Sequence, residues 1–308
     1  MPMLFFKPCK DTFLAILGKE FIIAWRFIDN DLWDTILPSL IIFMAAWIEG
    51  SKAWQELPLF LLYSLLYAWL YILTFCLSNQ LAGIEEDRIN KPYRPLVTGL
   101  VTVKQTRYRL IAYNLIYLVI AYQLEIFWFS VAWIFVSLKL NLFGWSDHWA
   151  TKNLLGMTLG TVILFNVQWR IAQLHQPISG ETQLYFLFLS LWAGFALPLQ
   201  DMRDQDGDRK AGRKTLPIAL GDQKARIVLA THFSLLSPFL FLAAMLTQVP
   251  LPTLVGNVWG LILLALQVLI HLAIAYRIIK YRNANSDHKT YLCYVFFFCA
   301  AIPMICFL

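Results

Sequence analysis

Long apolar segments constrain this chain more than any other feature. Each is bounded by charged residues, Pro or Gly, and hydropathy places them at 35–49, 57–78, 107–123, 126–142, 153–173, 184–200, 225–246, 253–276 and 290–308. One helix needs about 20 predominantly apolar residues to cross a bilayer. The pattern therefore predicts an all-α membrane protein with nine transmembrane helices, in which residues 1–308 form a single domain. The short region around Glu125 predicts a helical hairpin between the third and fourth segments.

The composition supports this prediction. The chain is 59% hydrophobic and 14% charged, whereas soluble proteins average about half apolar and a quarter charged residues. The five cysteines form no CxxC pair and have no His partner at metal-ligand spacing, so neither a disulfide framework nor a zinc site is expected. Residues 13–28 contain too many charged residues for a favourable transmembrane helix. They predict either a helix at the membrane interface or a lead-in to the first span.

The basic residues are distributed unevenly between the two sides of the predicted bundle. With nine spans, all 25 Lys and Arg residues except Lys52 and Arg170 fall on the side of the N-terminus. The positive-inside rule makes that side cytoplasmic, so the N-terminus and both polar loops described below are expected in the cytoplasm. The net charge of +6 then reflects cytoplasmic loops. We expect the lipid bilayer as a partner, but no nucleic acid and no obligatory protein partner.

Two polar loops, at 79–100 and 200–221, differ from the other connections. They resemble each other, because Asp87-Arg88 in the first corresponds to Asp208-Arg209 in the second, about 121 residues later. This similarity suggests a weak internal repeat of the kind common in polytopic proteins. Chance similarity between charged loops is the alternative. With nine spans, both loops lie on the same, cytoplasmic face.

Each polar loop carries regularly spaced oxygen ligands. Asp201, Asp204 and Asp208 are spaced i, i+3, i+7 and fall on one stripe if the sixth span continues helically. Such carboxylates repel one another unless they are protonated or neutralised by a cation, and all-oxygen ligands suit Mg²⁺. In the first loop Asn79 and Asp87 fall near one face at the end of the second span. Glu86 is a further candidate ligand there. The predicted catalytic and metal-binding residues are Asn79, Asp87, Asp201, Asp204 and Asp208.

Basic residues follow each acidic stripe. They are Arg88, Lys91 and Arg94 in the first loop and Arg209, Arg213 and Lys214 in the second. Carboxylates that hold Mg²⁺ beside cations that hold anionic oxygens are what a diphosphate group requires. The alternative is anchoring to anionic lipid, which gives no reason for aligned carboxylates. Within the spans, Asn166 is a candidate substrate contact, because polar residues are costly in a membrane. Ser64 and Gln267 are interpreted as helix-to-helix hydrogen bonders.

These motifs resemble the UbiA superfamily of intramembrane prenyltransferases. The resemblance rests on Asn79 and Asp87 with the following RINKPYRPL, and on the three aspartates from Asp201 to Asp208 with the following RKAGRKTLP. The stretch SLKLNLFGW at 137–145 is similar to the basic stretch of the family after span four, which adds Lys139 as a candidate substrate contact. The resemblance covers roughly 75–270. It implies a helical bundle around a central cavity, capped by the acidic loops, that binds a polyprenyl diphosphate through Mg²⁺ and ionises it.

The first motif departs from the usual pattern of the prenyltransferases. The motif of those enzymes usually reads NDxxDxxxD. In this chain Gln80 and Gly83 stand at the first two aspartate positions of that motif. The NxxxGxxxD form looks like the UbiA-type terpene cyclases. The favoured function is therefore a Mg²⁺-dependent cyclase that acts on a C15 or C20 polyprenyl diphosphate. The alternative is a prenyltransferase with an aromatic or lipid acceptor.

Two further points complete the prediction. Aromatic faces stabilise carbocations. Five aromatic residues on the second span are expected either to line the cavity or to pack between helices: Tyr63, Tyr67, Trp69, Tyr71 and Phe75.

A transporter or lipid-binding protein is the third hypothesis. It predicts charges within the spans and not two acidic loops on one face.

Overall fold

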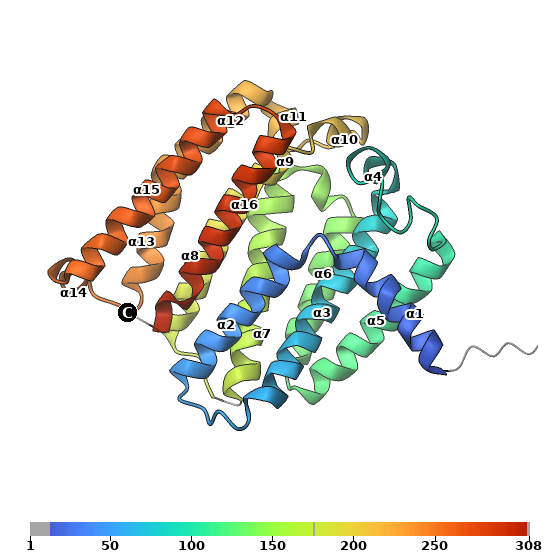
Figure 1. The fold of residues 1–308 in the computed structure, drawn as a ribbon, viewed down its shortest axis with the longest axis horizontal. Helices are drawn as coiled ribbons and strands as arrows, with labels where there is room; N and C mark the ends of the chain where they lie inside the picture. The colour runs from blue at the N-terminus through green and yellow to red at the C-terminus, as the bar shows by residue number, and fades with distance from the viewer. Residues whose placement is uncertain (1–12, 175, 307–308) are drawn as a thin grey trace, which may run out of the picture.

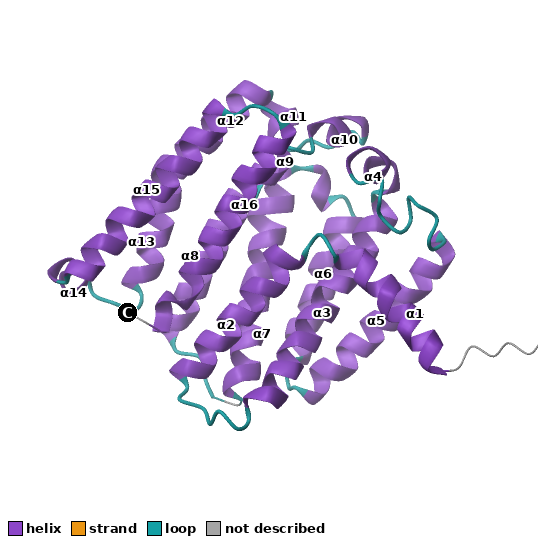
Figure 2. Ribbon diagram, in the orientation of Figure 1, coloured by secondary structure: helices purple, strands orange, loops and turns teal. Residues whose placement is uncertain are grey.

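Helices account for all the regular secondary structure in the described part of the chain. The computed structural model describes residues 13–174 and 176–306, and these ranges contain helices, short loops and a lone backbone bridge between His148 and Lys214 (Figure 2). Helices satisfy their own backbone hydrogen bonds, which a bilayer interior requires. The predicted all-α class is thereby confirmed for the described residues.

The first half of the chain contains the first acidic loop and the helices around it. In chain order these elements are α1 (Phe13–Ile28), η1 (Leu32–Ile36), α2 (Leu37–Glu49), α3 (Leu57–Ala82), α4 (Ile84–Asn90), α5 (Val103–Gln123), α6 (Phe127–Leu142), η2 (Trp145–Asp147), η3 (Ala150–Met157) and α7 (Thr158–Gln173). Residues 13–28 form a helix, whose place at the membrane interface stays a prediction. The hairpin predicted near Glu125 is confirmed, because α5 and α6 are joined there and φ of Glu125 is +59°.

The second half contains the second acidic loop. Its elements are α8 (Gly180–Ala196), α9 (Pro198–Asp201), α10 (Gln205–Lys210), α11 (Leu216–Leu220), α12 (Asp222–Thr231), η4 (His232–Leu236), α13 (Ser237–Leu246), α14 (Leu251–Gly256), α15 (Val258–Lys280), α16 (Ala284–Ala301) and η5 (Ile302–Cys306). Proline at the first or second position of α9, α11, α13 and α14 favours a helix start there, because its fixed φ suits the first turn.

Six helical segments of the described chain are long and apolar enough to cross a membrane. They are Leu32–Glu49, Leu57–Ala82, Ala150–Gln173, Gly180–Asp201, Asp222–Leu246 and Val258–Lys280. The helix α6 is apolar but shorter. The helices α5 and α16 also coincide with predicted spans, yet both carry charged residues in their first turns. The chain is thus a multi-pass integral membrane protein, and the count of nine spans stays a prediction.

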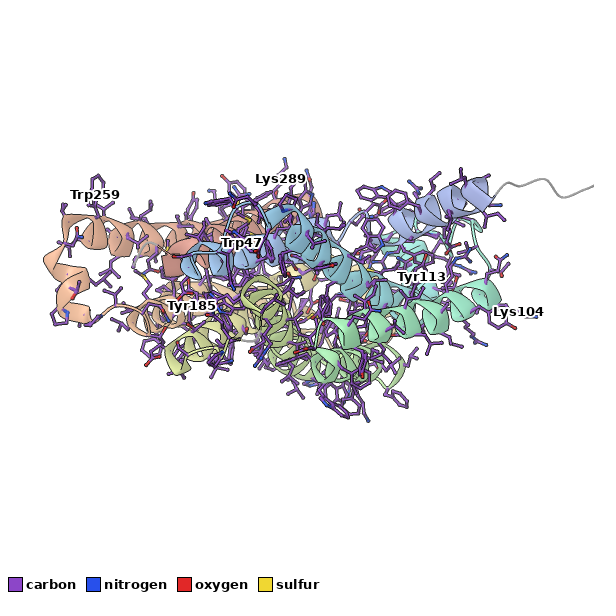
Figure 3. All side chains as sticks on the ribbon, turned by 90° about the horizontal axis from the view of Figure 1, so that it is seen from below. Trp47, Lys104, Tyr113, Tyr185, Trp259 and Lys289 are labelled. Atoms are coloured by element: carbon purple, nitrogen blue, oxygen red, sulfur yellow. The ribbon has the colours of Figure 1, made fainter. Side chains whose placement is uncertain are left out.

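The long helices pack side by side in an elongated bundle (Figure 1). The helix α7 contacts α2, α3 and α8, and α3 also packs on α5 and α6. One cluster of buried hydrophobic side chains extends from α2 to η5 and includes Trp47 and Tyr185. Trp259, by contrast, is 73% exposed near one end of the long axis (Figure 3). Exposed large apolar side chains are frequent on α5 and α15, as expected of surfaces that face lipid.

Hydrogen bonds between buried polar side chains join the helices. Ser64 Oγ donates to Gln168 Oε1 at 2.6 Å, which joins α3 to α7 and confirms the helix-to-helix interpretation for Ser64. The hydroxyls of Tyr67 and Ser130 lie 3.0 Å apart between α3 and α6. Such bonds contribute about 0.6 kcal/mol each in a membrane. For Gln267 the interpretation is wrong, because its Oε1 finds no partner among the described residues.

Candidate active site

The two acidic loops lie side by side at one end of the bundle, where α4 contacts α10 (Figure 1). Asn90 Nδ2 donates to the carbonyl oxygen of Asp204 at 3.2 Å, and the amide of Gly207 donates to Asn90 Oδ1 at 3.2 Å. A Cβ atom on residue 207 would lie 2.1 Å from Asn90 Nδ2, so only glycine allows this approach. The two motifs therefore contribute to one site.

Neither span continues into its loop as a straight helix. The helix α3 ends at Ala82, and α9 ends at Asp201, four residues before α10 begins. The prediction of one helical stripe for Asp201, Asp204 and Asp208 is therefore wrong, because the turn after Asp201 redirects the chain. Asp204 and Asp208 line a common cavity, which we call the inner cavity. Asp201 is buried apart from it.

The inner cavity, of about 170 Å³, is polar at one end and apolar at the other. Its polar lining comes from both loops and from the ends of the neighbouring helices: Asp31, Asp34, Thr35, Asn79, Glu86, Lys91, Arg94, Asn141, Ser146, Lys152, Gln200, Asp204, Asp208 and Arg213. Its apolar lining consists mainly of Tyr71, Ile72, Phe75, Trp133, Leu140, Met157, Leu164 and Leu197. A ligand with an anionic head and a hydrocarbon tail matches this division.

Arg94 organises the first motif. Its Nη1 donates to Asp87 Oδ1 at 2.7 Å, to Asp87 Oδ2 at 2.9 Å and to Asn79 Oδ1 at 3.2 Å. The side chains of Arg94 and Asp87 are only 6% and 3% exposed. Burial raises the pKa of the Asp87 carboxyl above its ordinary value, while Arg94 opposes that shift. Asp87 thus holds Arg94 in place at the cavity wall.

Arg213 bridges the two motifs. Its Nη1 lies 2.5 Å from Glu86 Oε2 and 3.7 Å from Asp208 Oδ1. Burial raises the pKa of Asp208 to about 6, and its Oδ2 is buried without a hydrogen-bond partner among the described residues. Glu86, weighed in the sequence only as a further ligand, is therefore a full member of the site.

Lys152 pairs with the remaining aspartate of the second motif. Its Nζ lies 2.6 Å from Asp201 Oδ1, and Asn153 Nδ2 donates to Asp201 Oδ2 at 3.2 Å. Lys152 lines the inner cavity, whereas Asp201 supports it from behind. Asp204 has a separate cation, because Arg203 Nε lies 3.5 Å from its Oδ1. Lys152 and Arg203 were not predicted as site residues.

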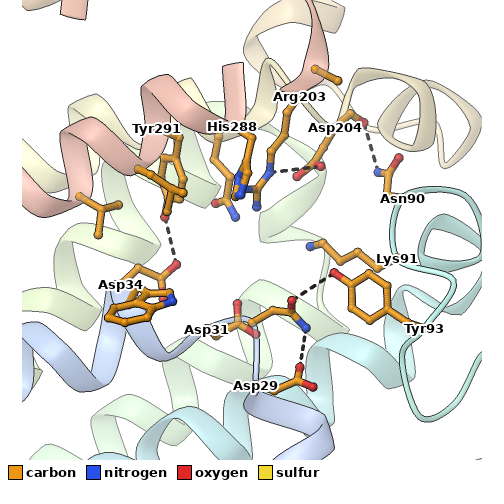
Figure 4. Close-up of a pocket in the computed structure, with 16 residues that line it drawn as sticks. Asp29, Asp31, Asp34, Asn90, Lys91, Tyr93, Arg203, Asp204, His288 and Tyr291 are labelled. Atoms are coloured by element: carbon orange, nitrogen blue, oxygen red, sulfur yellow. Dashed lines mark hydrogen bonds and ion pairs between the residues drawn. The ribbon is translucent and has the colours of Figure 1, made fainter. Parts of the chain in front are cut away.

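A third acidic segment, at 29–34, also reaches the site. Asp31 and Asp34 line the inner cavity, and they come from the connection between α1 and α2. Together with Asp29 they also line a second, outer cavity of about 430 Å³, whose wall includes Lys91, Arg203 and His288 (Figure 4). Sequence reasoning missed this segment, although its three aspartates within six residues next to a span were a usable signal.

Five of the predicted substrate contacts lie outside the two polar cavities. Arg88 and Arg209 are 61% and 65% exposed and pair with the neighbouring Glu85 and Asp206. Lys139 Nζ lies over the rings of Phe135 and Phe143. Lys214 makes backbone hydrogen bonds to residues 147 and 149. Asn166 donates to the carbonyl of Val162 and accepts from Gln183, so it joins α7 to α8.

Aromatic rings form part of the apolar end. Tyr71 and Trp133 stack with ring centroids 3.9 Å apart and an interplanar angle of 8°, and Phe75 stacks on Trp133 at 5.7 Å. The Tyr71 hydroxyl donates to the carbonyl of Gly160 at 2.9 Å. Among the aromatic residues predicted on the second span, Tyr71 and Phe75 line the cavity. The others, which pack elsewhere, are Tyr63, Tyr67 and Trp69.

The donor set of the inner cavity fits a divalent cation with a preference for oxygen. The ligand atoms are carboxylate and amide oxygens, which suit Mg²⁺, and Asp208 Oδ2 lies ready without a partner. Across residues 13–174 and 176–306, no three His, Cys, Asp or Glu side chains converge on one point as a complete metal site.

Several curated proteins are similar to this chain over most of its length. A diterpene cyclase of Hericium erinaceus is 34% identical over 290 residues, which span 92% of this chain and 88% of that protein. A somaliensene A/B synthase of Streptomyces somaliensis is 31% identical, over 91% of this chain and 90% of that one. A polyprenyl transferase of Hericium erinaceus is 32% identical, over 92% and 94%.

A solved structure has the same fold. The UbiA homologue of Archaeoglobus fulgidus bound to DMAPP and Mg²⁺ superposes with a TM-score of 0.66 at 16% identity, covering 92% of this chain and 97% of that one. The sequence model of the UbiA prenyltransferase family matches residues 35–302. This chain therefore belongs to the UbiA prenyltransferase family, as its paired motifs predicted.

Proposed function

We propose that this protein is a Mg²⁺-dependent terpene cyclase that ionises a C15 or C20 polyprenyl diphosphate and closes the resulting allylic cation on itself. The observation that carries the proposal is the inner cavity. One continuous space joins a charged end, built from both motif loops, to an apolar end with stacked aromatic rings. The diphosphate is assigned to the charged end and the prenyl chain to the apolar end.

The residues of the charged end divide into two roles. Asn79, Glu86, Asp204 and Asp208 supply oxygen ligands that would hold Mg²⁺, which when bound stabilises the charge of the leaving diphosphate. The cations that line the same space and bind the diphosphate oxygens are Lys91, Arg94, Lys152 and Arg213. Asp87 and Asp201, predicted as direct ligands, are proposed instead to position Arg94 and Lys152 through their ion pairs.

The apolar end protects the cation after the diphosphate leaves. Tyr71, Phe75 and Trp133 line it, and the negative quadrupole of an aromatic ring attracts a cation within about 6 Å. Leu140, Leu164 and other aliphatic side chains exclude water. A low-dielectric wall strengthens the interaction between fixed dipoles and the developing charge.

Gly83 and the relatives favour cyclisation. A Cβ atom on residue 83 would lie 3.5 Å from Glu86 Oε2 and 3.8 Å from Arg213 Nη2. An aspartate at this position, as in the prenyltransferase pattern, would add a carboxylate to the Glu86–Arg213 pair. Two curated relatives, named as a diterpene cyclase and a somaliensene A/B synthase, match 92% and 91% of this chain.

Prenyl transfer is the second candidate function. The 32% identity to a polyprenyl transferase and the outer cavity, which shares Lys91 and Asp204 with the inner one, favour it. The outer cavity offers space for a polar acceptor beside the diphosphate.

Incubation without an acceptor separates the two functions. Purified protein is supplied with C10, C15 or C20 prenyl diphosphate, with Mg²⁺ or with EDTA, and the organic extract is analysed together with inorganic diphosphate. We expect a cyclic hydrocarbon or alcohol only with Mg²⁺. Linear alcohol from every chain length, together with a prenylated product when 4-hydroxybenzoate, homogentisate or a quinol precursor is added, would refute cyclisation in favour of prenyl transfer.

A further inference from the structure

One carboxylate, Asp34, lies where three cavities meet. It lines the inner cavity, the outer cavity and a third space of about 60 Å³, which we call the tail cavity. The tail cavity is lined by side chains such as Phe165, Tyr294 and Phe298, and it shares Leu164 with the apolar end of the inner cavity. Asp34 is the sole charged residue in that lining.

The surroundings of Asp34 differ from those of the motif carboxylates. Tyr291 donates its hydroxyl hydrogen to Asp34 Oδ2 at 3.0 Å (Figure 4). Thr35 donates to Asp34 Oδ1 at 3.3 Å. Within the described residues no Lys, Arg or His forms an ion pair with it, whereas Asp204 and Asp208 each have an arginine within 4.0 Å. Asp34 is thus oriented by two hydroxyls while it keeps lone pairs that no cation occupies.

The local backbone explains this position. Asp34 lies in η1, a single π-helical turn that leads into α2. A π turn shifts the register of the helix and redirects a side chain, and such turns are frequent at functional sites. Tyr291 reaches Asp34 from α16, so two segments 257 residues apart in the sequence meet at this point.

We propose that Asp34 is the base that ends the cyclisation, with Tyr291 as its positioning residue; this inference rests on the proposed cyclase function. A carbon next to the cationic centre loses a proton to a carboxylate oxygen of Asp34. The electrons of the broken C–H bond form the new C=C bond, and the cation is neutralised. A ring system held in the inner and tail cavities presents its hydrogens to Asp34, the one charged group that both cavities share.

The outer cavity provides the exit for the proton. Asp34 forms part of its wall, together with polar residues such as Asn30 and His288 (Figure 4). The neutral Asp34 produced by one turnover can therefore return its proton to water on the polar side without exposing the cation. A base that touches both sides restores its charge before the next substrate binds.

The test measures ionisation and product separately in Asp34→Asn. Amide replaces carboxylate with almost the same shape, so binding and ionisation are retained while proton removal is lost. With the C15 and C20 diphosphates and Mg²⁺, we expect diphosphate release within about threefold of wild type. The ratio of cyclic hydrocarbon to water-quenched alcohol should fall by at least about tenfold. The reason is that a positioned base accelerates proton transfer by roughly 10²–10⁴-fold.

Two further variants complete the design. Asp34→Glu keeps a carboxylate and should restore hydrocarbon, with an altered ratio of double-bond isomers. Tyr291→Phe removes the hydroxyl and should shift that ratio while diphosphate release stays unchanged, which a merely structural role would not produce. Asp206→Asn is the matched control, because the Asp206 side chain is 86% exposed and lines none of the three cavities, and its products should match wild type.

Other outcomes overturn the assignment in distinguishable ways. An unchanged hydrocarbon-to-alcohol ratio in Asp34→Asn would show that another group takes the proton. Loss of diphosphate release in both Asp34→Asn and Asp34→Glu would place Asp34 in the ionisation step. Absence of cyclic product from the wild-type protein itself would refute the cyclase function, and this inference with it.

Discussion

Gly207 provides the sharpest test of how the two motif loops cooperate. A Cβ atom on residue 207 would lie 2.1 Å from Nδ2 and 2.4 Å from Cγ of Asn90. In Gly207→Ala, Asn90 must therefore rotate away, and the two hydrogen bonds that join α4 to α10 are lost. Each such bond contributes about 0.5–1.5 kcal/mol, so the docked arrangement is weakened by about 1–3 kcal/mol.

The consequence for activity follows from what the two loops carry. The helix α4 holds Glu86 and Asp87, and α10 holds Asp208, so undocking separates the two halves of the charged end. At about 1.36 kcal/mol per tenfold change, kcat/KM for diphosphate release should fall by about 5- to 160-fold. The assay is steady-state release of inorganic diphosphate from the C15 and C20 substrates, with thermal unfolding in detergent as a check on overall folding.

A double-mutant cycle isolates the mechanism. Asn90→Ala removes the same two hydrogen bonds without a clash, so it should reduce kcat/KM to the same extent as Gly207→Ala. The double variant should then be no worse than either single variant, because the bonds can be lost only once. Additive losses in the double variant would refute the reasoning, since they would show that Gly207 matters through its own backbone and not through Asn90.

Three further predictions address the metal site, the packing and the topology. Asp208→Asn should reduce diphosphate release at saturating Mg²⁺ by at least about 100-fold. Thermal unfolding of this variant should match wild type, and unchanged diphosphate release would exclude Asp208 from the site. Arg226→Met should lower the free energy of unfolding by about 3–5 kcal/mol, because it leaves a buried carboxylate unpaired. The carboxylate is that of Asp287, whose Oδ1 and Oδ2 each lie 2.8 Å from the Arg226 guanidinium. The control is the double variant Arg226→Met with Asp287→Leu, in which stability should recover. In a cysteine-free background, single cysteines near Asn90 and near Gly212 should be labelled from the cytoplasmic side, and labelling from opposite sides would contradict the predicted topology.

Much of the fold could be predicted because hydropathy is a property of local sequence. Each long apolar segment must become a helix in lipid, so the positions of α2, α3, α7, α8 and α15 followed from composition alone. The ends of helices were less predictable. The break after Asp201 depends on a turn of three residues that the spacing of the aspartates did not reveal.

The members of the candidate site could be predicted by type more easily than by role. Asp204, Asp208 and Arg213 line the inner cavity as the motifs suggested. The role of Lys152 depends on the contact between η3 and the end of α9. The role of Asp34 depends on a hydrogen bond from α16, which lies more than 250 residues later in the sequence. A single sequence carries no signal for contacts of that range. In each case a tertiary contact, and not the local spacing, decides the role.

The balance of charge in the inner cavity links these observations to the chemistry. Its lining holds five carboxylates and four cations: Asp31, Asp34, Glu86, Asp204 and Asp208 against Lys91, Arg94, Lys152 and Arg213. The lining therefore carries about one net negative charge when all groups are ionised. A diphosphate, with roughly three negative charges of its own at neutral pH, would be repelled from such a lining unless added cations offset both.

Under the proposed function, divalent cations would supply the positive charge that offsets the diphosphate and the acidic lining. The existing ion pairs must also open for the ligand to bind, because Glu86 and Arg213 now neutralise each other at 2.5 Å. A guanidinium that turned to the diphosphate would free the Glu86 carboxylate to hold the metal. We therefore propose that Arg213, which bridges both motifs, couples entry of the anion to formation of the metal site.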